Sequence, residues 1–207
     1  TQHRRLFAID YRNPANPKLI SDLSTRDRYN DIGSPVMKSL PNGRNVVRQA
    51  DDDIYLSGTG ASPDGDRPFL RKLNLATLRS EELWRSGVEE YEAFVALLSD
   101  DGTAFLTRKE SVVDPPNIYL RKVCPAGQAC TATASKQVTD FKDPSPQLRG
   151  IQKQLVKYKR ADGVDLSFTL YTPPGYKPGT PLPTLVWAYP LEFTDPSTAG
   201  QVTGSTN

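Results

Sequence analysis

Hydrophobic and polar positions alternate over short stretches of this chain, and turn-forming residues separate those stretches. Residues 93–111, AFVALLSDDGTAFLTRKES, contain two such stretches around an Asp-Gly pair, and residues 36–58 contain two more around an Asn-Gly pair. Asp-Gly or Asn-Gly between alternating segments is a strong signal of a β-hairpin. The pattern therefore predicts two antiparallel hairpins.

A similar pair of extended segments follows each hairpin. NIYLRKV (117–123) is similar to PFLRKLNL (68–75), and LFAID (6–10) occupies the same position one unit earlier. Four short antiparallel strands that recur at roughly 50 to 60 residues have the spacing of a β-propeller blade. Residues 1–141 are thus predicted to form about two and a half blades. Since so few blades cannot close a propeller, we expect more of the protein before Thr1.

The repeat ends before residues 142–150, KDPSPQLRG, whose polar and proline-bearing composition predicts a linker. Two alternating runs follow, at 154–159 and 165–171, with a tight turn between them. After a proline-rich loop comes the apolar run LVWAY (185–189), which is short, rich in β-forming residues and bounded by prolines. This run predicts a strand buried on both faces, of the kind found in α/β sheets covered by helices.

Composition narrows the function. The chain has 26 basic and 24 acidic residues, a net charge of +2, and its charges are interspersed. That balance gives no electrostatic reason to expect nucleic acid or an anionic membrane as a partner. No apolar stretch approaches the roughly 20 residues that span a bilayer. The 18 prolines and the hydrophobic fraction of 37% favour β structure with many turns.

Cys124 and Cys130, the two cysteines, lie in the turn-like segment KVCPAGQACTA. A zinc site would need two further ligands nearby, and the single histidine, His3, is far away in sequence. We therefore expect no metal and no cofactor, and interpret the cysteines as a disulfide that closes a hairpin. A disulfide would imply a periplasmic or secreted protein. The alternative is two thiols in a loop of a cytoplasmic protein.

Residues 158–193, YKRADGVDLSFTLYTPPGYKPGTPLPTLVWAYPLEF, resemble the start of the catalytic domain in the prolyl oligopeptidase family of serine peptidases. The stretches WAYP, AGQV and GS are most similar to its glutamyl-endopeptidase and acylaminoacyl-peptidase-like branch. In that family a β-propeller precedes an α/β-hydrolase domain. The resemblance implies a mainly β chain with partial propeller blades at 1–141, a linker at 142–150 and the N-terminal part of an α/β-hydrolase domain at 151–207. It also implies hydrolysis of a peptide substrate, with the propeller gating access.

The catalytic triad of such an enzyme is absent from these residues. The nucleophile would lie in a G-x-S-x-G turn, followed by an acid and then a histidine, and the sequence has no such motif. His3 precedes all the predicted strands, so we interpret it as a surface residue. We therefore expect this chain to be a fragment, inactive alone, whose partner is the remaining part of the same polypeptide.

The resemblance implies one catalytic role for this chain. In the family that this chain resembles, a tyrosine just past the early buried strand donates its hydroxyl to the oxyanion, and Tyr189 matches that position. A phenol held at a strand end can direct a fixed dipole to the point where negative charge develops. The alternative is a half-buried aromatic residue that closes the strand. Two other functions of the protein stay open: a propeller-type interaction module without catalysis, and an esterase on the same fold.

Overall fold

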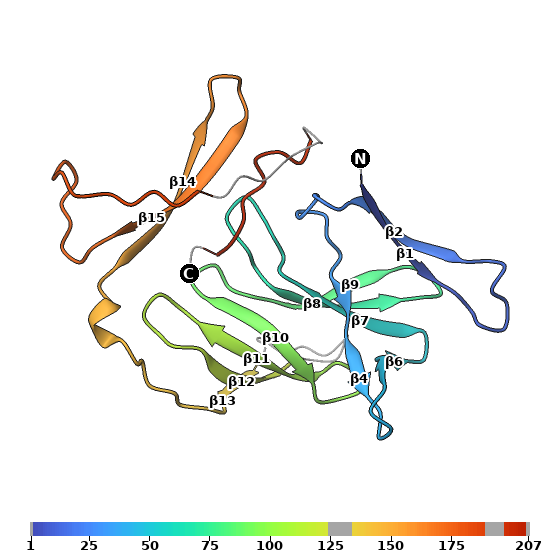
Figure 1. Ribbon diagram of the computed structural model, residues 1–207. Helices are drawn as coiled ribbons and strands as arrows, with labels where there is room; N and C mark the ends of the chain where they lie inside the picture. The colour runs from blue at the N-terminus through green and yellow to red at the C-terminus, as the bar shows by residue number, and fades with distance from the viewer. Residues whose placement is uncertain (1, 124–133, 189–196, 206–207) are drawn as a thin grey trace.

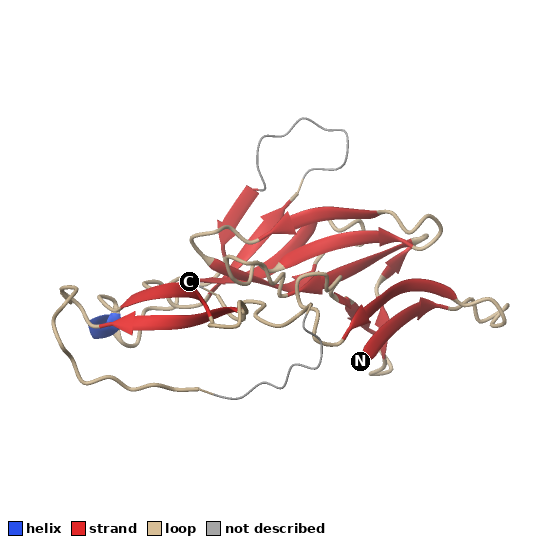
Figure 2. Cartoon of the chain, turned by 90° about the horizontal axis from the view of Figure 1, so that it is seen from above, coloured by secondary structure: helices blue, strands red, loops and turns tan. Residues whose placement is uncertain are grey.

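The computed structural model describes residues 2–123, 134–188 and 197–205 (Figure 1). Strands make up nearly all the regular structure, and the only helix within these residues is the short 3₁₀ helix η1 (Pro146–Leu148; Figure 2). The prediction of a mainly β chain is confirmed. No helix in the described part of the chain has the length and apolar character needed to cross a lipid bilayer.

The chain begins with one hairpin. β1 (His3–Ala8) pairs antiparallel with β2 (Lys18–Ser24), and a shift of register falls between Leu6 and Phe7. β1 overlaps the segment LFAID (6–10), which the repeat placed at the position of 68–75 and 117–123.

The second sheet has β7 (Asp53–Gly58) at its centre. β7 pairs with β3 (Ser34–Pro35), β6 (Gln49–Ala50) and β8 (Phe69–Asn74), and β8 pairs with β9 (Ser80–Arg85). Beside this sheet, β4 (Met37–Ser39) and β5 (Asn45–Val47) form a hairpin around Gly43, whose φ of 78° suits a tight turn. The hairpin predicted at the Asn-Gly pair is confirmed.

The third sheet is an antiparallel meander of four strands. Its order is β10 (Tyr91–Leu97), β11 (Ala104–Glu110), β12 (Asn117–Lys122) and β13 (Ala134–Gln137). The turn between β10 and β11 contains Gly102 at φ 76°, so the hairpin predicted at the Asp-Gly pair is confirmed as well.

Two hydrophobic clusters hold the sheets together, one on each face of the second sheet. Tyr55, on β7, packs with residues of β8 and β9 and with residues of the third sheet, in a cluster that contains Val36, Leu70, Trp84, Leu97 and Phe105. The neighbouring β7 residues Ile54 and Leu56 pack on the other face against Ile20 of β2. The alternation of side chains along β7 thus makes it a strand buried on both faces. The side-by-side arrangement of the three sheets in Figure 1 follows from these clusters.

The sheets in the described residues do not close into a ring (Figure 1). After η1 comes a separate hairpin, in which β14 (Gln152–Lys159) pairs antiparallel with β15 (Asp165–Thr172). The two alternating runs predicted in this region are confirmed as strands.

The prediction of a buried strand at 185–189 is wrong for the residues that the structure describes. Leu185, Val186 and Trp187 lie outside any strand, and their exposed fractions are 90%, 81% and 89%. The physical reason is that none of the described strands pairs with this run. An apolar sequence becomes a buried strand only when neighbouring strands take up its backbone hydrogen bonds.

Candidate functional site

The C-terminal segment (residues 197–205) lies against two loops, one between β2 and β3 and one between β7 and β8. In the β2–β3 loop (residues 25–33), the backbone N–H of Arg28 donates to Gln201 Oε1 at 2.8 Å, and Gln201 Nε2 donates to Asp27 Oδ1 at 3.1 Å. The N–H of Val202 donates to the hydroxyl oxygen of Tyr29 at 2.8 Å. Residues far apart in sequence are therefore held together by polar contacts of good geometry.

The second loop in contact with this segment is the β7–β8 loop (residues 59–68). The N–H of Asp66 donates to the carbonyl oxygen of Gly204 at 2.8 Å. The carboxylate of Asp66, only 9% exposed, pairs with Arg28 at 3.3 Å. The two loops are thus linked to each other as well as to the C-terminal segment.

The opposite side of the C-terminal segment faces the β14–β15 hairpin. Gly200 has a φ of +80°, and a Cβ atom at this position would lie 2.0 Å from the carbonyl oxygen of Asp165. A side chain there is excluded both by the backbone conformation and by the close approach. Lys157 of β14 also pairs with Asp64 of the β7–β8 loop at 2.9 Å. The C-terminal segment therefore lies between the β2–β3 and β7–β8 loops on one side and the hairpin on the other, as the red ribbon in Figure 1 shows.

A cavity of about 320 Å³ opens at this junction. Its lining comes from three parts of the chain. The β2–β3 and β7–β8 loops supply Tyr29 and Pro63, the hairpin supplies five residues, and the C-terminal segment supplies the rest, the full set being Tyr29, Pro63, Lys157, Tyr158, Asp165, Leu166, Ser167, Ser197, Ala199, Gly200, Gln201 and Val202. Cavities between the parts of a chain are preferred places for ligands. We take this junction cavity as the candidate functional site.

The electrostatics of the junction favour an ionised Asp27. Burial raises the pKa of this carboxyl group, but hydrogen bonds from Asn30 and Gln201 outweigh that effect, and the pKa lies below its usual value. The carboxylate is therefore charged near neutral pH and remains an acceptor for Gln201.

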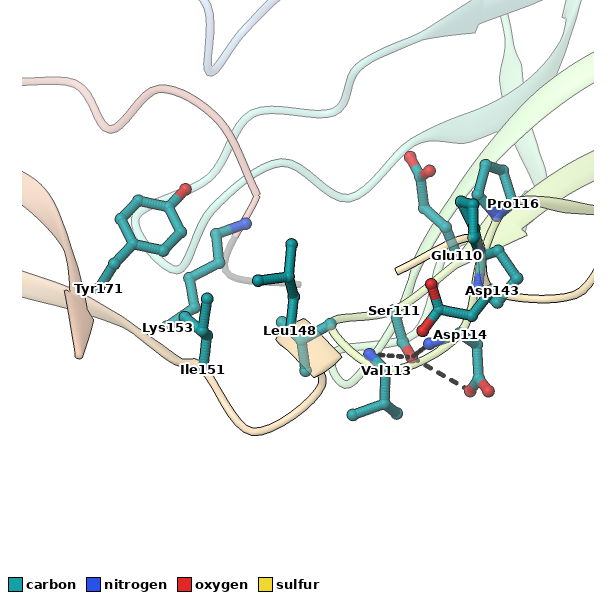
Figure 3. Close-up of a pocket in the computed structure, with 13 residues that line it drawn as sticks. Glu110, Ser111, Val113, Asp114, Pro116, Asp143, Leu148, Ile151, Lys153 and Tyr171 are labelled. Atoms are coloured by element: carbon teal, nitrogen blue, oxygen red, sulfur yellow. Dashed lines mark hydrogen bonds between the residues drawn. The ribbon is translucent and has the colours of Figure 1, made fainter. Parts of the chain in front are cut away.

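A second cavity, of about 440 Å³, lies between the β11–β12 loop and the start of the hairpin (Figure 3). Lys153 and Tyr171 lie on one side of it and Glu110 and Asp114 on the other, with Leu148 between them. Burial lowers the pKa of the Lys153 ammonium group, and the charge of Glu110 partly opposes this shift.

The carboxylates of this second cavity are held by neighbouring residues. Asp114 accepts a hydrogen bond from the Ser111 hydroxyl at 3.1 Å. Asp143 accepts from Arg149 Nε at 2.7 Å and from the Ser145 N–H at 2.8 Å, and these bonds lower its pKa. Both carboxylates are thus oriented by residues of their own loops.

The single histidine does not lie at either cavity. His3 is on β1, its side chain is 45% exposed, and its Nδ1 lies 2.7 Å from Asp22 Oδ1. Arg5 donates to the other oxygen of the same carboxylate. His3 is a surface residue, as predicted. Within the described residues, no group of three or more potential ligands is arranged to hold a metal ion.

The other site residues named from the sequence, Tyr189, Cys124 and Cys130, lie outside the described residues, so the oxyanion role and the disulfide stay predictions. The sequence did not identify Asp27, Arg28 and Tyr29 as partners of Gln201 and Val202. The stretch AGQV, which contributed to the family resemblance, contains Gly200, Gln201 and Val202. This stretch indicated from the sequence that Gly200, Gln201 and Val202 matter, but it gives no information about the loop that they contact.

No protein-family model matches the chain. Two curated plant proteins are similar to nearly all of it. It is 41% identical over 208 residues to a protein of Oryza sativa subsp. japonica named probable glutamyl endopeptidase, chloroplastic, covering 93% of this chain and 21% of that protein. It is 38% identical over 212 residues to a protein of the same name in Arabidopsis thaliana, covering 94% of this chain and 21% of that protein. The chain thus spans about a fifth of the length of these relatives.

Similarity to solved structures is weaker. An AtxE2 isopeptidase without ligand is 11% identical, with a TM-score of 0.42, over 86% of this chain and 31% of that one. TolB from Acinetobacter baumannii is 14% identical, with a TM-score of 0.34, over 82% of this chain and 35% of that one. Both TM-scores are too low to carry an argument about fold or function.

Proposed function

We propose that this chain is part of a serine peptidase of the prolyl oligopeptidase family that cleaves peptide chains at glutamyl residues. In this proposal residues 1–141 belong to a β-propeller that restricts access, and 142–150 form the linker. Residues 151–207 begin an α/β-hydrolase domain, and the nucleophile, acid and base come from other parts of the same polypeptide.

One observation carries the proposal: 41% identity over 93% of this chain to a protein named as a glutamyl endopeptidase. The order of the described elements supports it, because successive antiparallel sheets precede a separate hairpin and an apolar run. The sequence contains no G-x-S-x-G motif, which agrees with a region of the enzyme that does not supply the nucleophile. Its balanced charge agrees with a role in access and binding of peptides.

Tyr189 is the catalytic residue that we assign to this chain. Its hydroxyl would donate a hydrogen bond to the oxyanion of the tetrahedral intermediate, a kind of interaction that typically contributes about 2.7 to 4 kcal/mol to catalysis. The second donor would be a backbone N–H next to the nucleophilic serine. The assignment follows from the family resemblance at WAYP.

The proposal is tested by comparing this chain with a longer protein that contains it and its downstream sequence. We expect the longer protein to cleave a fluorogenic peptide with an internal glutamate at least about tenfold faster than the same peptide with glutamine. Glutamine is the matched control, because the two side chains differ in charge and hardly in shape. The 207-residue chain should show no turnover, because a positioned nucleophile is missing.

A fluorophosphonate probe and a small ester complete the design. Covalent labelling of any serine in the 207-residue chain would contradict its predicted inactivity. Turnover of p-nitrophenyl acetate without peptide cleavage would indicate an esterase. A longer protein that neither cleaves nor reacts with the probe would indicate an interaction module instead.

A further inference from the structure

The side chain of Gln201 makes a two-point contact with consecutive residues of the β2–β3 loop. Its oxygen accepts from Arg28 N and its nitrogen donates to Asp27 Oδ1. A carboxamide carries an acceptor and a donor side by side, whereas a carboxylate has only acceptors and an ammonium or guanidinium only donors. The loop is therefore complementary to glutamine.

Two further contacts fix the backbone next to this glutamine. Val202 is 5% exposed, and its N–H has the Tyr29 hydroxyl as acceptor. A buried N–H that loses its acceptor costs about 1 to 3 kcal/mol. On the other side, Gly200 contacts Asp165 of the hairpin so closely that a Cβ atom has no space. Three consecutive residues thus connect the β2–β3 loop to the hairpin.

We infer that Gln201 and Tyr29 are positioning residues for the proposed peptidase site: the β2–β3 loop sets the placement of the C-terminal segment, and through it the alignment of the hydrolase part with the blades. This inference rests on the proposed function and goes beyond it, because it gives the blades a role in ordering the site in addition to restricting access. The covalent link matters here, since the C-terminal segment follows Tyr189 in the sequence.

A charge swap tests the placement in the 207-residue chain itself. Gln201→Glu keeps the acceptor for Arg28 N but sets a second carboxylate against Asp27, so we expect release of the C-terminal segment near pH 7. Hydrogen exchange measured by mass spectrometry should show the amide of Val202 exchanging at least about tenfold faster. Adding Asp27→Asn should restore protection, because the side-chain amide of the introduced asparagine can donate to the new carboxylate.

Matched controls separate release of the segment from loss of the fold. Asp27→Asn alone should leave the exchange nearly unchanged, because its amide oxygen can still accept from Gln201. Its amide nitrogen then faces Asn30, whose side-chain amide donates to Asp27 Oδ2 in the wild type and can turn over to accept instead. Tyr29→Phe should accelerate exchange at Val202 while amides of β7 and β8 stay protected. If Gln201→Glu unfolds the whole chain, this Tyr29 variant decides the question. Unchanged exchange at Val202 in both variants would overturn the inference.

Kinetics of the longer protein test the consequence for catalysis. A misplacement of about 1 Å can cost on the order of a hundredfold in rate, so Gln201→Glu should lower kcat by about tenfold or more with little change in KM, and Asp27→Asn should rescue it. If the wild-type protein is active and kcat is unchanged although the segment is released, the positioning role is wrong while the proposed function stands. If the wild-type protein is not a peptidase, the proposed function fails and the exchange experiment still decides the placement.

Discussion

A single carboxylate, that of Asp101, organises the turn between β10 and β11. It accepts hydrogen bonds from the backbone N–H of Thr103 at 3.0 Å and from the Thr103 hydroxyl at 2.7 Å. Hydrogen bonds from the side chain of Ser99 and from Thr103 lower the pKa of Asp101 to about 2. These donors are neutral, so the effect depends on local geometry and not on an ion pair.

The titration of Asp101 should make the stability of this turn depend on pH. A carboxyl group whose pKa is lower in the folded state than in the unfolded chain stabilises the fold above its unfolded pKa of 3.8, and this contribution disappears as the pH falls toward about 2. NMR of the carboxyl carbon should therefore report a midpoint near 2.

Asp162 provides the comparison for this titration. Its pKa is also about 2, chiefly because of its hydrogen bond with Arg160. Salt at high concentration screens charged partners, so it should raise the pKa of Asp162 more than that of Asp101. An ordinary midpoint for Asp101 would contradict the hydrogen-bonded turn.

The sequence predicted this turn but not the residue that packs on it. Asp-Gly is a local signal, whereas the Tyr55 hydroxyl that donates to the carbonyl oxygen of Asp100 at 2.9 Å comes from another sheet. A Cβ atom on Gly102 would lie 2.4 Å from Tyr55 Cε1. Glycine is needed here for the turn and for the packing, and only the first reason is visible in the sequence.

Three neighbouring strands share one buried polar network. Glu92 of β10 accepts hydrogen bonds from the Thr107 hydroxyl of β11 and from both Nε and a terminal nitrogen of Arg121 of β12. The Glu92 side chain is 1% exposed and that of Arg121 is 12% exposed. Because both charges are largely removed from water, each depends on its partner.

Removing one charge from this network should destabilise the third sheet strongly. Breaking a buried ion pair typically costs about 3 to 5 kcal/mol, whereas replacing both members by apolar residues is often close to neutral. We expect Arg121→Met to lower the urea midpoint markedly and Glu92→Leu with Arg121→Met to recover part of the loss, because the buried Thr107 hydroxyl then loses its acceptor. Lys159→Met, at an exposed ion pair with Asp165, is the control and should have little effect. A double variant less stable than Arg121→Met would contradict the network.

The hydrophobic pattern of the sequence predicts β10 as a strand but does not reveal the irregularity within it. The strand was predicted, but a register shift between Phe94 and Ala96 leaves Val95 48% exposed. In a regular strand, two residues on the same face are an even number of positions apart. Phe94 and Leu97 are three positions apart, and both contact the first hydrophobic cluster because the extra residue shifts the alternation. Glu92 is equally hidden from a hydrophobicity pattern, because its burial depends on an arginine in another strand.

At the scale of the whole molecule, exposed apolar side chains follow the first three sheets in the sequence, in the β14–β15 hairpin and in the run at 185–187. The even-numbered residues of the β14–β15 hairpin share one face, on which Tyr158 and Phe168 make an edge-on ring contact with centroids 6.0 Å apart and exposed fractions of 49% and 48%. The run at 185–187 is more exposed still. The sequence pattern predicted a buried strand at 185–189, and 185–187 are exposed instead, because burial is a property of the assembled sheet and cannot be derived from one strand alone.

The two tryptophans make this difference measurable. Trp84 packs in the first hydrophobic cluster and is 7% exposed, whereas Trp187 is 89% exposed. In the 207-residue chain, the Trp84→Phe variant should emit like tryptophan in water and be quenched by acrylamide almost as fast as a free indole. The Trp187→Phe variant should emit at shorter wavelength and be quenched several-fold more slowly.

The same measurement extends to the longer protein. The proposed hydrolase domain requires the apolar run to be covered when its remaining strands are present, so the emission of Trp187 should become protected there while that of Trp84 stays unchanged. Protection of Trp187 already in the 207-residue chain, independent of protein concentration, would contradict the exposed run. Protection that grows with concentration would instead indicate self-association through these residues, as exposed apolar patches favour. A Trp187 that stays freely quenched in the longer protein would contradict the proposed hydrolase domain.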